Sequence, residues 1–324
     1  MPRPSARSLL LTAVVLLAIA ACASRRQARR ERFIARRIES ADTAPRRMLV
    51  HDGLTRRYVV RAPAGTSRTS APLPLVLVLH GGGGNATNAE QMTGFTRLVE
   101  REHIIVVYPD GIEAREGAPL ETWNAGHCCG PAMQRKVDDV GFIAALLDEL
   151  QRELPVDASR IYVTGMSNGA MMSHRIGREL APRIAAIAPV VGTVFGDEST
   201  PSSPVSALMI NGLLDRNIPA DGGLSGGLGA STWDGTPMLP YIAQGTFWAA
   251  ANGCSPAPTR AVQGTVTVSR YGCPDGRRVE VQQVSDNGHA WPGGARIGRV
   301  GDVPSTAMRA TEVMWAFFAS VRKR

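Results

Sequence analysis

Short, continuous apolar runs alternate with amphipathic stretches over most of the chain. Continuous apolar runs at residues 75–79 and 104–108 are typical of strands that are buried on both faces. Further strands are expected at residues 57–62, 160–164, 184–191 and 207–211. Helical periodicity lies between them, at residues 89–102, 140–154 and 168–181. Strands that alternate with helices in this way predict the α/β class, with a mostly parallel sheet and helices on both of its faces.

The pattern loosens after the last of these strands. Residues 219–240 are rich in glycine and predict a long surface loop or a lid-like insertion. A helix is then expected at residues 241–251, strands at 265–271 and 279–285, and a closing helix at 305–321. We expect one catalytic domain over residues 48–324, because no break divides the alternation.

The first 21 residues have the features of an export signal. Arg3 and Arg7 precede an apolar run that is too short to span a bilayer comfortably. The run ends in Ile-Ala-Ala before Cys22, which is similar to the bacterial lipobox, in which the cysteine becomes the lipidated N-terminus. The chain is therefore expected in the cell envelope as a lipoprotein. The alternative is a secretory signal cleaved near Ala21, with Cys22 incidental.

The positive charge of the chain is confined to its N-terminal part. The formal net charge is +8, of which residues 1–21 carry +2 and residues 22–47 carry +6, so residues 48–324 are neutral. A nucleic-acid-binding domain should carry its basic patch on the folded body, so nucleic acid is not an expected partner. Residues 22–47 are expected to form an Arg-rich stalk or linker, either solvated or attracted to anionic lipid.

Cysteine usage agrees with an oxidising compartment. Four cysteines remain after Cys22, which allows three pairings. The favoured pairing joins Cys254 to Cys273 and leaves Cys128 and Cys129 as a vicinal pair. A metal site is the alternative, but no CxxC element or histidine cluster accompanies these cysteines.

Residues 165–169, Gly-Met-Ser-Asn-Gly, match the nucleophile elbow Gly-x-Ser-x-Gly. The short pattern alone is weak, because glycine and serine are common here. Its context is the one that the elbow requires, with a predicted strand before it and a predicted helix after it. Flanking glycines also relieve the strained turn. Ser167 is therefore the candidate nucleophile, and a serine in an ordinary glycine-rich turn is the alternative.

A serine hydroxyl needs a general base, and the base needs an acid that orients it. In this arrangement the acid and then the histidine follow the serine along the chain. His174 lies on the helix that leads away from the elbow, whereas His289 lies in a loop rich in glycine and proline. His289 is the candidate base. Asp215, just past the end of a predicted strand, is the candidate acid, with Asp197 as the alternative.

Four glycines follow His80 at the end of the first central strand. Such a loop lets backbone N–H groups approach a substrate oxygen, and an oxyanion hole pairs one of them with the N–H of the residue after the nucleophile. Gly82 and Asn168 are the candidate donors, with Gly83 as the alternative to Gly82. The phosphate-binding patterns Gly-Lys-Ser/Thr and Gly-x-Gly-x-x-Gly are absent from this loop.

Four motifs together resemble the polyhydroxybutyrate-depolymerase-type esterases, which are related to the feruloyl and acetylxylan esterases and include bacterial lipoproteins. They are Leu-His-Gly-Gly-Gly-Gly at 79–84, Asp-Asp-Val-Gly-Phe at 138–142, Gly-Met-Ser-Asn-Gly-Ala-Met-Met at 165–172 and Gly-His-Ala-Trp-Pro-Gly at 288–293. The resemblance covers roughly residues 50–320. It implies the α/β-hydrolase fold, a triad of Ser167, Asp215 and His289, and no cofactor. One departure is Asn211, where the family commonly has histidine four residues before the acid.

These features predict an exported serine esterase that acts through an acyl-enzyme on Ser167. Its substrates would be hydroxybutyrate oligomers, feruloyl esters or acetylated polysaccharide, with a soluble ester favoured over a crystalline polyester. A monomer without a metal is expected. Trp123 and Trp291 are candidates to line the substrate pocket, although packing in the core is the alternative for both. A serine peptidase of the same fold and an inactive cell-surface binding lipoprotein are the alternative functions.

Overall fold

A computed structural model describes residues 45–114, 120–227, 232–297 and 301–323. The predicted export signal, the lipid-anchor candidate Cys22 and nearly all of the predicted stalk lie outside these residues. Within the described ranges, no helix is both long and apolar enough to span a bilayer.

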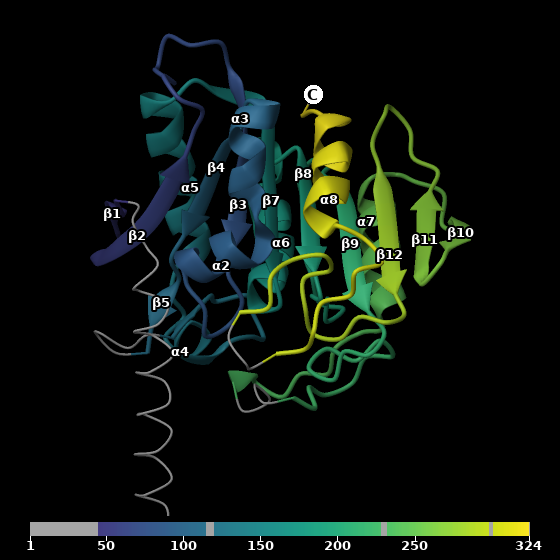
Figure 1. Cartoon of the computed structure of the whole chain (residues 1–324). Coiled ribbons are helices and arrows are strands. Elements are labelled where there is room, and N and C mark those ends of the chain that lie inside the picture. The colour runs from purple at the N-terminus through teal and green to yellow at the C-terminus, as the bar shows by residue number, and fades with distance from the viewer. Residues whose placement is uncertain (1–44, 115–119, 228–231, 298–300, 324) are drawn as a thin grey trace, which may run out of the picture. The chain divides into compact units, whose positions relative to one another are not determined.

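The core is a sheet of ten strands in the order β1-β2-β4-β3-β7-β8-β9-β12-β11-β10 (Figure 1). The strands are β1 Arg47–His51, β2 Leu54–Arg61, β3 Leu73–Leu79, β4 Ile105–Pro109, β7 Val156–Met166, β8 Ala186–Val190, β9 Ser206–Gly212, β10 Thr259–Gln263, β11 Val266–Tyr271 and β12 Val279–Val284. The run from β4 to β12 is parallel, and the outer strands pair antiparallel. The prediction of a mostly parallel sheet is confirmed.

Helices cover both faces of this sheet. They are α2 Ala86–Thr93, α3 Leu98–Glu102, α4 Gly130–Gln134, α5 Asp139–Glu153, α6 Asn168–Glu179, α7 Tyr241–Ala251 and α8 Ala310–Ala319. Alternate residues of β3 separate into two cores: Leu75, Leu77 and Leu79 pack with α5, α6 and α7, whereas Val76 and Val78 pack with α2, α3 and α8. The continuous apolar run of this strand therefore results from its burial on both faces.

Two predicted helices have different bounds in the structure. The helix predicted at 89–102 is divided into α2, a 3₁₀ turn at Phe95–Arg97 and α3, because Gly94 takes a left-handed conformation with φ of 67° that ends α2. The closing helix begins at Ala310 instead of residue 305. Ser305 lies in the preceding loop, where its hydroxyl donates to Asp286 at 2.8 Å.

The loop predicted at 219–240 has no helix or strand in its described part. An isolated β-bridge joins Gly223 to Met238 within the loop, and another joins Trp233 of the loop to Cys128 outside it. Its action as a lid stays a prediction. Helix α4 and the small strand pair β5 Ile112–Glu113 and β6 Glu121–Thr122 were not predicted from the sequence.

Both favoured disulfides are present. Cys254, just after α7, pairs with Cys273, just after β11, and Cys128 pairs with Cys129. The first bridge connects two segments that are 19 residues apart and fixes the start of the β10–β11 hairpin beside the core.

The candidate site residues leave the sheet at one edge. His80 follows β3, Ser167 follows β7, Asp215 lies three residues beyond β9 and His289 five residues beyond β12. Parallel strands all end at the same edge of a sheet, which is the lower edge in Figure 1. The fold therefore gathers residues that are up to 209 positions apart in the sequence.

Candidate active site

Ser167 occupies a sharp turn between β7 and α6. Its φ of 57° and ψ of −120° are strained for a residue with a side chain, and α6 begins at the next residue. A methyl group on Gly169 would lie 2.4 Å from the carbonyl oxygen of His80, and one on Gly165 would lie 2.6 Å from Gly169. Both positions therefore require glycine, which is the physical basis of the Gly-x-Ser-x-Gly pattern here.

Asp215 and His289 form a hydrogen-bonded pair. The Asp215 Oδ2 accepts from His289 Nδ1 at 2.7 Å, while its Oδ1 accepts from the backbone N–H groups of Asn217 and Ile218 at 2.8 and 2.9 Å. The Asp215 side chain is fully buried and that of His289 is 15% exposed. A neutral imidazole that donates from Nδ1 presents an unprotonated Nε2, which is the form a general base needs.

The loops that carry this pair are packed together. The Leu214 N–H donates to the Asn287 carbonyl at 3.0 Å, and a methyl group on Gly212 would lie 2.3 Å from the same oxygen. On the other side, Asp302 Oδ2 accepts from the His289 N–H at 2.6 Å. The backbone on both sides of the imidazole is thus fixed. Asn211, the residue that departs from the family pattern, is buried in β9.

Ser167 lies on the same sheet edge as this pair. Among the described residues no hydrogen bond joins the Ser167 hydroxyl to the His289 imidazole. Catalytic hydrogen bonds of this kind are often long before substrate binds. The structure brings two of the three predicted residues into contact and places the third on the elbow.

The glycine loop after β3 lies against the elbow. A methyl group on Gly82 would be 3.5 Å from Asn168 Cβ. The Gly83 N–H donates to the Glu121 carbonyl at 2.8 Å and the Gly84 N–H to the Gly81 carbonyl at 2.9 Å, so the N–H of Gly82 is a better candidate donor than that of Gly83. Asn168 is the first residue of α6, where N–H groups have no acceptor within the helix.

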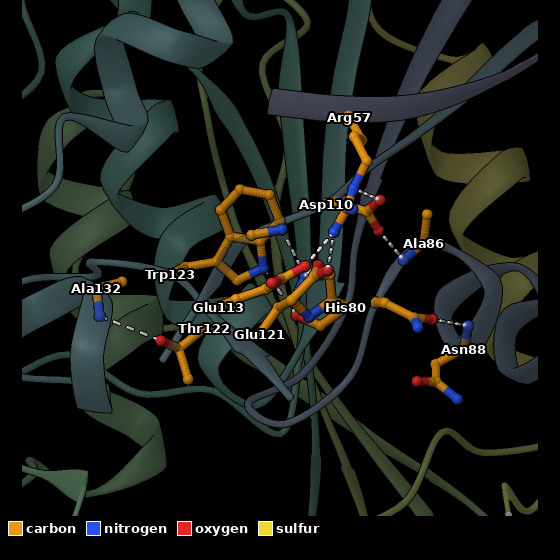
Figure 2. Close-up of polar contacts among 12 residues, drawn as sticks. Arg57, His80, Ala86, Asn88, Asp110, Glu113, Glu121, Thr122, Trp123 and Ala132 are labelled. Atoms are coloured by element: carbon orange, nitrogen blue, oxygen red, sulfur yellow. Dashed lines mark hydrogen bonds and ion pairs between the residues drawn. The ribbon is translucent and has the colours of Figure 1, made fainter. Parts of the chain in front are cut away.

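A buried polar cluster supports this loop from behind (Figure 2). His80 donates from Nδ1 to the Gly81 carbonyl at 2.8 Å and accepts the Gly111 N–H at Nε2 at 2.9 Å. Burial lowers the pKa of His80 to about 4, so the ring is neutral at physiological pH. It therefore acts in the structure as a fixed hydrogen-bonding group.

Two buried carboxyl groups, Asp110 and Glu121, complete the cluster. Burial, and for Glu121 also the neighbouring Asp110 carboxylate, raises the pKa of both groups. Glu121 Oε2 is buried and accepts no hydrogen bond from the described residues, whereas Asp110 accepts the Ala86 N–H at 2.7 Å and pairs with Arg46. The other oxygen of Glu121, Oε1, accepts from Arg57 Nη2 at 3.2 Å.

Trp123 and Trp291 are both in the core. Their side chains are 0% and 1% exposed. The Trp123 indole N–H donates to the His80 carbonyl at 3.1 Å, and that of Trp291 donates to Thr311 at 3.1 Å. This burial favours the packing alternative over direct contact with substrate for both tryptophans.

The alternative acid, Asp197, binds a different histidine. His127 lies between two carboxylates, with its Nε2 2.8 Å from Asp197 and its Nδ1 2.7 Å from Asp234. Burial lowers the pKa of His127, but the hydrogen bonds to Asp234 and Asp197 outweigh it, and the net shift is upward. Asp215 is thus the better candidate acid. No sequence pattern indicates this second Asp–His group, because its members come from three separate loops.

His174, the other histidine after the elbow, is a core residue. Its Nδ1 accepts from the Trp248 indole at 2.9 Å and its Nε2 lies 2.9 Å from Gln244 Oε1. Burial lowers its pKa to about 4. Within the described ranges, no group of three or more His, Cys, Asp or Glu side chains could hold a metal ion.

The fold and the site together define a hydrolase of the α/β-hydrolase class, and comparisons with known proteins identify its family. Residues 57–219 match the family model described as esterase PHB depolymerase. NocK of Nocardia uniformis subsp. tsuyamanensis, which is named as an esterase, is 30% identical over 82% of this chain and 79% of its own length. The chain belongs to the PHB depolymerase esterase family and is a carboxylic ester hydrolase.

Two further similarities agree with this family. Feruloyl esterase C of Emericella nidulans is 30% identical over 52% of this chain and 58% of its own. The solved structure of the acetyl xylan esterase from Aspergillus awamori superposes with a TM-score of 0.55 over 85% of this chain and 99% of its own, at 13% identity. The latter similarity confirms the fold.

The close approach at the elbow predicts a large cost for Gly169→Ala. The added methyl group would meet two backbone carbonyl oxygens, His80 at 2.4 Å and Leu79 at 2.7 Å, which cannot rotate away. The free energy of unfolding, measured by urea denaturation, should fall by about 3 kcal/mol. Gly272→Ala is the control, because its nearest neighbour is a serine hydroxyl at 3.4 Å. Equal stability of the two variants would contradict this packing.

The buried His174 predicts a pH-dependent stability. Below pH 6.5 the unfolded chain binds a proton that the folded protein accepts only near pH 4. The free energy of unfolding should therefore fall as the pH drops from 6.5 to 4. In His174→Asn, urea denaturation should give a slope smaller by up to about 1.4 kcal/mol per pH unit. The exposed His103→Asn is the control, and an unchanged slope in the His174 variant would refute the prediction.

Proposed function

We propose that the chain hydrolyses carboxylic esters through an acyl-enzyme on Ser167. The observation that carries this proposal is the hydrogen bond between Asp215 and His289, which leaves the imidazole Nε2 as a base on the edge where the elbow presents the serine. His289 takes the Ser167 proton as the hydroxyl attacks the ester carbonyl, and it then gives that proton to the leaving alcohol. Water, activated by the same imidazole, releases the acid from the serine.

The negative oxygen formed in each step is held by two backbone N–H groups. The N–H of Gly82 and that of Asn168 are the donors in this proposal, because the neighbouring Gly83 N–H is already bonded to Glu121. Asp215 stabilises the imidazolium that forms during the reaction. Its two hydrogen bonds from Asn217 and Ile218 keep the carboxylate oriented while the charge develops.

The substrates and the cellular location belong to the same proposal. The names of the relatives favour hydroxybutyrate, feruloyl or acetyl-polysaccharide esters. We place an export signal at residues 1–21, a lipid anchor at Cys22 and a stalk at residues 22–47, ahead of the catalytic domain at residues 48–324. The apolar run that ends in Ile-Ala-Ala-Cys supports export, and the two disulfides of the described residues are compatible with it.

The Ser167→Ala variant tests the mechanism. Its kcat should fall by up to about 10⁶, while its circular dichroism and urea denaturation remain close to those of the parent. The substrate panel should include p-nitrophenyl butyrate, methyl ferulate, acetylated xylan and hydroxybutyrate oligomers. A fluorophosphonate probe should label the parent but not this variant, because the probe requires an activated serine.

Ser269→Ala is the matched control, because Ser269 is a buried serine in β11. It should retain both labelling and turnover. If Ser167→Ala hydrolyses every ester that the parent hydrolyses, and at the parental rate, the acyl-enzyme route is ruled out. Peptide anilides, assayed in parallel, distinguish an esterase from a peptidase of the same fold.

A further inference from the structure

We propose that the side chain of Asn168 is a positioning residue, which fixes the two oxyanion donors relative to each other by binding the backbone of Trp123. This inference rests on the proposed function, in which the backbone N–H of Asn168 is one of those donors. It concerns the carboxamide of the same residue, which makes a separate set of contacts.

The Asn168 carboxamide is paired with both backbone groups of a single residue. Its Oδ1 accepts the Trp123 N–H at 2.7 Å, and its Nδ2 donates to the Trp123 carbonyl at 3.0 Å. The side chain is buried, with 1% of the residue exposed. Two antiparallel hydrogen bonds to one residue define the orientation of the carboxamide as well as its distance, much as a strand pair does.

The chain just before Trp123 is paired with the other half of the oxyanion hole. The Gly83 N–H donates to the Glu121 carbonyl at 2.8 Å, and the Glu121 N–H donates to the Gly84 carbonyl at 3.3 Å. The Trp123 indole adds a bond to the His80 carbonyl at 3.1 Å, and Figure 2 shows the indole beside His80 and Glu121. Residues 121–123 therefore contact the glycine loop on one side and Asn168 on the other.

This connecting segment is itself held to the core. The Asn124 N–H donates to Asp139 Oδ2 at 2.7 Å, and the Asn124 side chain donates to the Val137 carbonyl at 2.9 Å. Asp139 in turn is paired with Arg56 at 2.7 Å, and both side chains are at most 1% exposed. A segment anchored in this way can act as a fixed spacer between the Gly82 and Asn168 N–H groups.

Asparagine suits this position because its side chain carries one acceptor and one donor, and it is long enough to bind both the N–H and the carbonyl of Trp123. An aspartate has the same shape, but its ionised form presents a second acceptor to the Trp123 carbonyl. Its protonated form restores the donor. A serine is too short to bind both backbone groups. A misplacement of about 1 Å in a catalytic group can cost about 10²-fold in rate, so the position of the donor should be visible in kcat.

The decisive experiment is the pH dependence of Asn168→Asp relative to the parent. At pH 8 the variant should have a kcat on p-nitrophenyl butyrate that is about 10- to 100-fold lower, with a KM within about threefold of the parent. Because only 1% of residue 168 is exposed, burial should raise the pKa of the introduced carboxyl above its ordinary value of about 3.9, so that it gains its proton as the pH falls to 5. The ratio of the variant's kcat to that of the parent should then rise by at least about fivefold. The parent is measured at each pH, so that pH effects common to both proteins cancel in the ratio.

The charged groups around this contact are compatible with the test. His80, against the Trp123 ring, has a pKa lowered to about 4 by burial and stays neutral over most of the range. The Arg56–Asp139 pair lies behind Trp123, and Arg175 donates to the Asn124 carbonyl at 2.8 Å. Glu121, whose pKa is raised well above its ordinary value by burial and Asp110, is present in both proteins.

Asn252→Asp is the matched control. Asn252 is also a fully buried asparagine whose Nδ2 donates to backbone carbonyls, those of Val205 and Trp248 at 2.8 Å, but it lies at the end of α7. This variant should lose stability while the pH dependence of its kcat ratio stays flat. Asn168→Ser is a second variant, with an expected loss of about 10- to 100-fold in kcat and a pH-independent ratio.

Three outcomes would overturn the proposal: a flat kcat ratio for Asn168→Asp from pH 8 to pH 5, a ratio for Asn252→Asp that rises equally, or a parental kcat for Asn168→Ser. If Asn168→Asp does not fold, the Asn168→Ser result decides alone. Failure of the proposed function is distinguishable, because it would appear as full activity in Ser167→Ala whatever the Asn168 variants do.

Discussion

The hydrogen bond between His289 and the buried Asp215 carboxylate is the interaction on which the rest of the site depends. It forms only because β9 and β12 are neighbours in a parallel sheet and end at the same edge. The backbone N–H groups of Asn217 and Ile218 compensate the carboxylate for its burial, and Asp302 holds the histidine from the other side. Removing water from this pair strengthens its electrostatic coupling and makes its geometry well defined.

The serine side of the site is organised by close backbone contacts. At the elbow, Gly165 and Gly169 allow β7, α6 and the end of β3 to approach within distances that a side chain would prevent. Ser167 is thereby held in a strained conformation, and the N-terminus of α6 is placed beside the glycine loop. The segment at residues 121–124 then contacts both the glycine loop and Asn168. The candidate active site is thus supported by loops that are themselves anchored to the core.

Much of this architecture could be predicted from the sequence, because buried parallel strands leave continuous apolar runs and the elbow leaves a short motif. The edge strands β1 and β10 escaped prediction, since their residues are mostly exposed and lack that signal. Chain order and position relative to strands made Ser167, Asp215 and His289 the candidates, and the structure joins the last two by a hydrogen bond. The sequence did not indicate two other contacts: the pairing of His127 with Asp197 and Asp234, and the contact between Asn168 and Trp123. These contacts join loops, and no hydrophobic periodicity in the sequence indicates that those loops lie close together in space.

A crystal structure of the enzyme phosphonylated by a fluorophosphonate would test the central claim most directly. The account predicts a covalent bond from phosphorus to Ser167 Oγ and a phosphoryl oxygen within about 3 Å of the backbone nitrogens of Gly82 and Asn168. It also predicts that His289 Nε2 lies within hydrogen-bond distance of the modified serine. An adduct on another residue, or a phosphoryl oxygen directed away from both nitrogens with the imidazole remote from the serine, would contradict the account.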